Sequence, residues 1–158
     1  MCEVLEGFYP SRVFDASHSD DPNNSRSVSG YLYMFAGGPV TWSSKKQPVV
    51  ALSSCESGYI TLAYASQEAV YLSDLLSELT FPQFSSVHMY EDNMGALQLS
   101  GSTPFSSRTK HIRTRYYFPR ELVASKKIID THVKTTYQLA DIFAEFLDYP
   151  SLRPSWTR

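Results

Sequence analysis

Short apolar segments separated by polar or glycine-rich stretches fill the first third of the chain, and this pattern predicts strands. Arg12–Ala16 and Gly30–Phe35 predict the first two strands, and Val40–Ser44 predicts a third. His18–Ser29, rich in Asp, Asn and Ser, predicts a long loop, and Gly37–Pro39 predicts a turn. Because both connections resemble hairpins, we expect these three strands to pair antiparallel.

The pattern changes to helical spacing at Ser53, which forms a capping box with Glu56. Apolar residues then recur on one helical face until Phe81–Pro82 ends the helix. The next part of the chain predicts a strand at Val87–Tyr90, a short helix through Leu99 and a loop at Gly101–Ser107. A helix is then predicted at Thr109–Ser125, although Pro119 should end or kink it. The chain continues with a strand at Ile128–Val133, a second capping box of Thr135 and Gln138, and a helix at Tyr137–Leu147.

The element order β, β, β, α, β, α, α, β, α predicts an α/β fold in which helices cover the faces of a mixed sheet. With 158 residues, of which 42% are hydrophobic and 19% charged, the chain has the composition of one folded domain. We place this domain at residues 12–147, after an N-terminal lead-in at 1–11 and before a loose C-terminal tail at 148–158.

Charge and cysteine content exclude several classes of protein. A net charge of -2 excludes gross basicity, so a nucleic-acid partner would have to meet a local basic patch. Cys2 and Cys55 make neither a disulfide framework nor a metal cluster, which favours a reducing, intracellular compartment and leaves cytoplasm and nucleus open. No apolar run is long enough to span a bilayer, so we expect no membrane partner.

Three aspartates, Asp15, Asp92 and Asp141, each close a short apolar segment and precede a turn-like or helix-like stretch. Sites in open α/β sheets lie beyond the carboxyl ends of strands, and Asp92 follows the strand Val87–Tyr90 directly. These carboxylates can therefore share divalent metal ions at one edge of the sheet. The alternatives are a surface turn for Asp15, a helix N-cap for Asp92 and a solvated helix face for Asp141.

Several segments occur in an order that resembles a known family. They are Asp15–Gly30 (DASHSDDPNNSRSVSG), Trp42–Tyr59 (WSSKKQPVVALSSCESGY), Glu91–Asn93 (EDN), Ser107–Phe118 (SRTKHIRTRYYF) and Gln138–Phe143 (QLADIF). Together they resemble the ribonuclease H domain at the C-terminal end of copia-type retrotransposon Pol polyproteins, over nearly the whole chain. The resemblance implies a ribonuclease H-like fold built on a five-stranded mixed sheet.

The resemblance also implies an activity. The family cuts the RNA strand of RNA–DNA hybrids with two Mg²⁺ ions held by four carboxylates, and Mn²⁺ is an expected substitute. Asp15, Asp92 and Asp141 match three of these carboxylates, so we expect them to be the catalytic, metal-binding residues. The implied partners are RNA–DNA hybrid and the reverse transcriptase region of a Pol polyprotein.

Gly58 stands where the resemblance places the fourth carboxylate, a glutamate. This glycine predicts a weakened second metal site and reduced or lost cleavage, as in a degenerate copy of the domain. Glu56 is disfavoured as a replacement, because residues two apart on a helix point to different sides and the capping box already explains Glu56. We therefore expect Gly58→Glu to raise cleavage, and to raise the free energy of unfolding by up to about 1 kcal/mol.

Three functions remain open from the sequence. The first is a hybrid-binding domain with impaired cleavage, and the second is a fully active nuclease with an improvised fourth ligand. The third is a non-catalytic nucleic-acid or protein-interaction domain derived from a transposon remnant.

A stretch from Arg108 to Lys127 carries seven basic residues against one acidic residue. This asymmetry favours contact with phosphates, although a solvated helix whose aromatic residues Tyr116 and Phe118 face the core explains the same pattern. We expect His111 and His132 to be structural or partly exposed rather than proton carriers. The residues that we expect to bind nucleic acid are Lys45, Lys46, Arg108, Lys110, Arg113 and Arg115.

Overall fold

The computed structural model of the chain describes residues 11–16, 25–79, 86–101 and 113–144. Nearly all of the predicted lead-in and the whole predicted tail lie outside these residues, as do most of the predicted loops at 18–29 and 101–107. The basic residues Arg108 and Lys110 and the histidine His111 also lie outside them.

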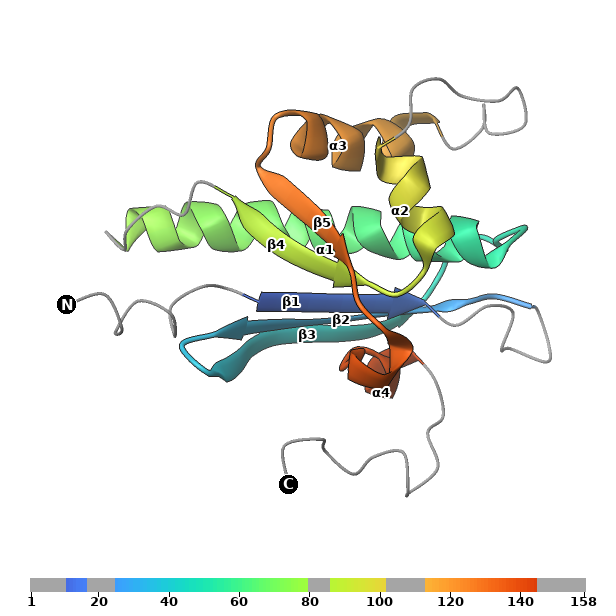
Figure 1. Ribbon diagram of the computed structural model, residues 1–158, viewed down its shortest axis with the longest axis horizontal. Helices are drawn as coiled ribbons and strands as arrows, with labels where there is room; N and C mark the ends of the chain where they lie inside the picture. The colour runs from blue at the N-terminus through green and yellow to red at the C-terminus, as the bar shows by residue number, and fades with distance from the viewer. Residues whose placement is uncertain (1–10, 17–24, 80–85, 102–112, 145–158) are drawn as a thin grey trace.

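Five strands form one mixed sheet in the order β3-β2-β1-β4-β5 (Figure 1). β1, β2 and β3 pair antiparallel, as predicted, whereas β1 pairs parallel with β4, and β4 pairs parallel with β5. The predicted five-stranded mixed sheet is therefore confirmed. The strands are β1 (Ser11–Ala16), β2 (Val28–Phe35), β3 (Gly38–Lys46), β4 (Val87–Glu91) and β5 (Ile128–His132).

The predicted order of strands and helices is also confirmed. Pro119, which was predicted to end or kink its helix, lies inside α3. No helix among the described residues is long and apolar enough to cross a membrane. The helices are α1 (Ser54–Glu78), α2 (Met94–Gly101), α3 (Arg113–Ala124), the 3-10 helix η3 (Thr135–Tyr137) and α4 (Asp141–Ala144).

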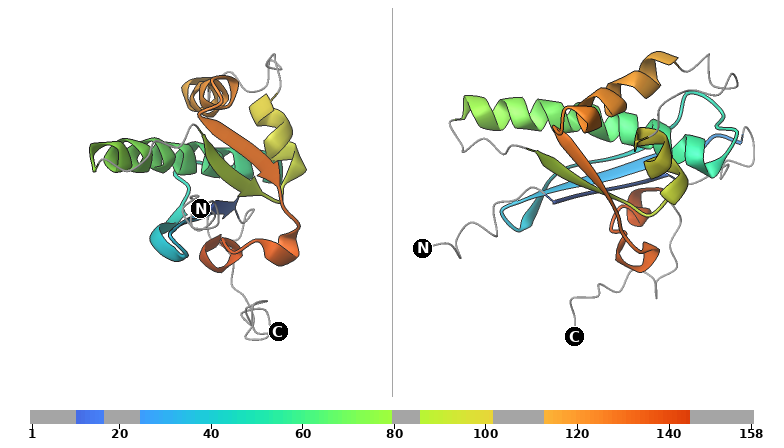
Figure 2. Two further views of the ribbon diagram at one scale, coloured as in Figure 1. Left: turned by 60° about the vertical axis from the view of Figure 1, so that its left-hand side comes forward. Right: turned by 45° about the horizontal axis from the view of Figure 1, so that its top comes forward.

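Helices lie on both faces of the sheet (Figure 2). On one face, α1 and α3 bury a core of apolar side chains with β2, β4 and β5, and Phe118 packs against it, as its helical position predicts. On the other face, α4 packs on Leu32, Tyr90 and neighbouring residues. Because side chains alternate along a strand, Val87, Met89 and Glu91 of β4 point toward α1, whereas Tyr90 points toward α4.

The connection between β2 and β3 is shorter than predicted, because Gly38 and Pro39 belong to β3. Ala36 and Gly37 alone make the turn, with φ of 51° and 80°. Two successive residues with positive φ give a turn whose twist matches that of paired antiparallel strands. This tight turn helps to fix the register of β2 on β3.

The first predicted capping box is confirmed for Ser53, which is the N-cap of α1, whereas Glu56 reaches back to the residue before the cap. The side chain of Ser53 accepts a hydrogen bond from the backbone N–H of Glu56 at 3.2 Å, and Glu56 Oε2 accepts one from the N–H of Leu52 at 2.8 Å. The second predicted capping box, at Thr135, is wrong. The hydroxyl of Thr135 instead donates to Asp92 Oδ2 at 2.6 Å, and the last helix begins at Asp141 rather than at Tyr137.

Gly30→Ala should lower the free energy of unfolding by about 1–3 kcal/mol, because overpacking forces neighbouring atoms apart. A Cβ at position 30 would lie 2.9 Å from the backbone carbonyl carbon of Phe143, in α4. Urea unfolding measures the change. Gly38→Ala is the matched control, because a Cβ at position 38 meets nothing within 4 Å, and it should change stability by less than about 0.5 kcal/mol. Equal losses in the two variants would contradict this account of how α4 packs.

Candidate metal centre at the carboxyl ends of β1 and β4

Parallel pairing of β1 with β4 brings two of the predicted aspartates together. Val13 of β1 is the partner of Tyr90 of β4. Asp15 and Asp92 each follow two residues later, so they lie side by side where the two strands end. The same alternation directs both side chains toward the face on which α4 packs.

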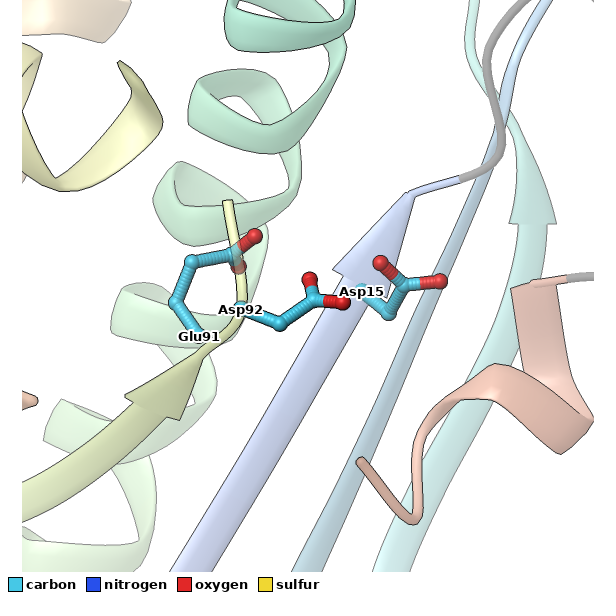
Figure 3. Close-up of side chains that lie close together, drawn as sticks. All are labelled: Asp15, Glu91 and Asp92. Atoms are coloured by element: carbon cyan, nitrogen blue, oxygen red, sulfur yellow. The ribbon is translucent and has the colours of Figure 1, made fainter. Parts of the chain in front are cut away.

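Three carboxylates meet at this edge of the sheet. Asp15, Glu91 and Asp92 each place one carboxylate oxygen within 4.8 Å of the other two, which is a spacing that a single cation can bridge. Figure 3 shows the carboxylate of Asp92 between those of Glu91 and Asp15. Asp15 is 8% exposed and Glu91 is 0% exposed, so two of the three carboxylates are withdrawn from water.

Glu91 is the member of this group that sequence reasoning missed. Its Oε1 accepts a hydrogen bond from the backbone N–H of Asn93 at 3.1 Å, and its buried Oε2 has no hydrogen-bond partner. Burial raises the pKa of the Glu91 carboxyl well above its usual range, and the negative charges of Asp15, Asp92 and Asp141 raise it further against the opposing Asn93 hydrogen bond. The site therefore holds a carboxylate in an environment that disfavours its negative charge.

The helix cap beside this site is Asn93 rather than Asp92. Asn93 Oδ1 accepts hydrogen bonds from the N–H groups of Gly95 at 3.0 Å and Ala96 at 3.2 Å, at the start of α2. The carboxylate of Asp92 is therefore not used as a cap, and its bond from the hydroxyl of Thr135 holds it in place. The alternative reading of Asp92 as the helix cap is wrong.

Asp141 approaches the same edge as the first residue of α4, on the face toward which Asp15 and Asp92 point. Gly30 is the pairing partner of Asp15, and α4 packs on it so closely that a Cβ there would lie 3.0 Å from the carbonyl oxygen of Ala140. Asp141 does not belong to the three carboxylates within 4.8 Å of one another, but its negative charge helps to raise the pKa of Glu91. Its predicted mid-helix position is wrong, because it lies in the first helical turn.

Gly58 lies at a close contact between α1 and α2, so a packing reason for this glycine exists. A Cβ at position 58 would lie 3.1 Å from the Cβ of Ala96 and 3.5 Å from Glu91 Oε1. Nearby, a Cβ on Gly95 would overlap the sulfur of Cys55. A side chain at position 58 therefore meets a neighbour that has to move, and the stability gain expected from replacing a helical glycine does not follow.

A buried polar cluster places the first turns of α1 on the sheet. Gln47 Nε2 donates to Ser29 Oγ at 2.9 Å and to the carbonyl oxygen of Ser57 at 3.0 Å. The hydroxyl of Thr61 donates to Ser29 Oγ at 2.6 Å. These bonds join β2, the end of β3 and α1 next to Gly58. Sequence reasoning singled out the block that contains Gln47 but gave the residue no role.

Two of the predicted basic residues lie at the same edge of the sheet as the carboxylates. Ser29 pairs with Ala16 on one side and with Lys45 on the other, so Lys45 lies two strands from the residue that follows Asp15. Neighbouring strands are about 4.8 Å apart, which puts Lys45 and Lys46 about 10 Å from β1. Both lysines are exposed. They can therefore reach phosphates near the carboxylates.

The remaining predicted contacts are placed less favourably or not at all. Arg113 and Arg115 belong to α3, but their side chains are not described. Arg120 donates its Nε–H to the carbonyl oxygen of Leu99 at 2.8 Å, which gives it a structural role. His132 ends β5 and is exposed, in agreement with its expected position.

Two relatives show which proteins this chain resembles in sequence. The sequence is 36% identical over 142 residues to the retrovirus-related Pol polyprotein from transposon TNT 1-94 of Nicotiana tabacum, a match that covers 90% of this chain and 10% of the relative. It is 39% identical over 127 residues to the Pol polyprotein from transposon RE2 of Arabidopsis thaliana, covering 80% and 9%. This chain is a homologue of one segment of the retrotransposon Pol polyproteins. It spans about a tenth of their length, and no protein-family model matches it.

Solved structures identify the fold of this chain as that of ribonuclease H, as the sequence predicted. The ribonuclease H1 of Halobacterium salinarum superimposes with a TM-score of 0.61 at 18% identity and covers 86% of this chain and 94% of its own. LC11-RNase H1, solved in complex with an RNA/DNA hybrid, superimposes with a TM-score of 0.59 at 12% identity, covering 85% and 93%.

The donor set of this site fits a hard divalent cation. All three clustered side chains offer carboxylate oxygen, which Mg²⁺ and Mn²⁺ prefer over nitrogen or sulfur. The unpartnered Oε2 of Glu91 is a buried acceptor that a cation would satisfy. Asp15 and Asp92 are the residues best placed to hold it, and Asp141 begins α4 on the same face of the sheet.

The metal-free protein should lose stability as pH rises from the ordinary titration range of glutamic acid. Because the pKa of Glu91 is raised in the folded state, the folded chain keeps a proton that the unfolded chain releases, and the stability present at low pH is lost as pH rises through the folded pKa. One such proton gives a slope of at most about 1.4 kcal/mol per pH unit. Urea unfolding in chelator across this range measures it.

Glu91→Gln should flatten this dependence, because the amide does not titrate. An unchanged slope in Glu91→Gln would show that another group causes the dependence.

Proposed function

We propose that this chain binds RNA–DNA hybrid and hydrolyses the RNA strand with divalent metal ions. The observation that carries the proposal is the approach of the Asp15 and Asp92 carboxylate oxygens to within 4.8 Å of each other and of Glu91. The ribonuclease H fold supports it, and so does the hybrid bound by LC11-RNase H1. The polyprotein relatives support action within a Pol polyprotein, and we propose its reverse transcriptase region as a further partner.

The chain's own residues have defined roles in this reaction. In hydrolysis, water loses a proton as its oxygen forms a bond to phosphorus, the bond from phosphorus to the 3′ oxygen breaks, and the 3′ oxygen takes up a proton. Bound divalent cations supply Lewis acidity to both ends of that displacement and lower the pKa of the attacking water. Asp15 and Asp92 fix the cation position, the Thr135 hydroxyl keeps the Asp92 carboxylate in one orientation, and Asp141 adds negative charge from the side of α4.

Binding of the hybrid is a separate role that the backbone phosphates dominate. Lys45 and Lys46 lie exposed at the edge of the sheet that carries the carboxylates. Contacts of this kind position a duplex without reading its sequence. The basic residues of 108–115 are added to this proposal on their charge alone.

A second candidate function is a domain that binds hybrid without cleaving it. Gly58 favours this candidate, because it removes a side-chain carboxylate from the helix position that the family resemblance assigns to a ligand. A weakened second metal site would then leave binding intact and slow the chemical step.

Asp92→Asn should lower the rate of hybrid cleavage by about 10²–10³, which is the effect of deleting one electrostatic element at an active site. The assay uses a labelled RNA–DNA hybrid with Mg²⁺ and, separately, with Mn²⁺. Asp74→Asn, at an exposed position of α1, is the control and should cleave at the rate of the original chain. Cleavage that Asp92→Asn does not change would refute the proposed site. Hybrid binding without any cleavage would instead favour the second candidate.

The affinity for hybrid should fall steeply with added salt, because each neutralised phosphate releases a counterion. The double substitution Lys45→Ala and Lys46→Ala should weaken binding to hybrids of different sequence about equally and reduce the log–log salt slope by about 2. Fluorescence anisotropy at several salt concentrations measures both quantities. Lys126→Ala and Lys127→Ala, exposed just beyond α3, test whether the other end of the basic stretch contributes. A sequence-selective loss would contradict binding through phosphates.

A further inference from the structure

The carboxylate of Glu91 lies at the place that Gly58 leaves open. A Cβ built on Gly58 would be 3.5 Å from Glu91 Oε1, which is an ordinary van der Waals contact. The side chain of a glutamate at position 58 would start at that Cβ and extend into the space that Glu91 fills. A glutamate at position 58 of α1 and the glutamate at position 91 of β4 would therefore place their carboxyl groups in the same region.

Glu91 reaches this volume because of the alternation along β4. It points toward α1, as Val87 and Met89 do, whereas Asp15 and Asp92 point toward the face of α4. At the end of the strands the two directions converge, and an oxygen of Glu91 comes within 4.8 Å of an oxygen of each aspartate (Figure 3). The site thus receives carboxylates from both faces of the sheet.

The second oxygen of Glu91 is the observation that points to a ligand. Glu91 is fully buried, its Oε1 is used by the N–H of Asn93, and its Oε2 has no hydrogen-bond partner. A buried carboxylate oxygen without a donor is costly, and buried charges in proteins are paired or coordinate metals. No other described carboxylate joins this cluster.

We propose that Glu91 supplies the carboxylate that Gly58 lacks, so that a ligand for Mg²⁺ or Mn²⁺ has moved from helix α1 to the end of strand β4. The inference rests on the proposed function, because it concerns the same metal site. On this inference Gly58 does not indicate a lost metal site, because the glycine at position 58 and the glutamate at position 91 compensate each other. Glycine at position 58 leaves the volume free, and glutamate at position 91 fills it with the same chemical group.

Glu56, the other acidic residue near Gly58, does not serve this role. Its Oε2 accepts a hydrogen bond from the backbone N–H of Leu52, which holds the carboxylate at the start of α1. It is also absent from the described carboxylates within 4.8 Å of one another. Glu56 therefore provides a matched control for Glu91. It is a buried glutamate on the helix that carries Gly58, and Glu56→Gln is the same conservative change as Glu91→Gln.

The first test measures metal affinity directly, by titrating the protein with Mn²⁺ and following the paramagnetic resonance signal of free Mn²⁺. Glu91→Gln should weaken Mn²⁺ binding by about tenfold or more, because changes even in residues that only orient ligands have effects of that size. Glu56→Gln should bind Mn²⁺ as the original chain does. The amide oxygen in the Glu91→Gln variant remains an acceptor for the Asn93 N–H, so this variant should fold, and circular dichroism checks this.

The second test moves the carboxylate back to the helix. Glu91→Ala should weaken Mn²⁺ binding, and adding Gly58→Glu to it should recover at least part of the affinity. Gly58→Glu alone should give no tighter binding than the original chain, because two carboxylates would share one buried volume. The effects of the two substitutions are thus expected to be strongly non-additive.

The outcomes separate this inference from the proposed function. If Asp92→Asn weakens Mn²⁺ binding and Glu91→Gln does not, Glu91 is not a ligand and the inference is overturned, while the site of the proposed function stands. If neither substitution weakens binding, both are overturned. If Glu91→Gln weakens binding in a chain that cleaves no hybrid, the inference stands and the nuclease function falls.

Discussion

Repulsion among carboxylates at the ends of two parallel strands is the constraint on which the rest of this site depends. The parallel pairing of β1 with β4 places Asp15 and Asp92 side by side, and Glu91 adds a third carboxyl group that is fully buried. Like charges at this distance raise one another's energy, and burial adds to the cost. The surrounding packing holds the three side chains in place, and either a proton on Glu91 or a bound cation lowers the electrostatic cost.

The surrounding packing depends on positions without side chains. Gly30 lets α4 contact β2 beside Asp15, Gly58 lets α2 and Glu91 approach α1, and Gly95 lets the start of α2 approach Cys55. At each position, a Cβ would meet a neighbouring atom at 3.1 Å or less. Close contacts at these glycines allow α1, α2 and α4 to pack tightly beside the ends of β1 and β4. This packing places Asp141 and Asn93 next to the carboxylates.

Much of this architecture could be predicted from local patterns. The order of strands and helices follows from apolar spacing, and Asp15 and Asp92 follow from their positions after apolar strands. Glu91 was not predictable in this way. It is the last residue of a strand in a run of three polar residues, and only the packing of α1 on β4 shows that it is buried. Thr135 failed as a cap for a related reason, because its hydroxyl bonds a residue that lies 43 positions away in the chain.

Gly58 shows why the loss of a ligand cannot be inferred from one sequence position. A metal site requires an oxygen at a point in space, and that point can be reached from any element that ends nearby. Here the end of β4 and the first turns of α1 both reach that point, but a buried place holds one carboxylate far more favourably than two adjacent ones. Glutamate at position 58 and glutamate at position 91 are therefore alternatives to each other. The meaning of Gly58 depends on Glu91, and the two residues have to be interpreted as one unit.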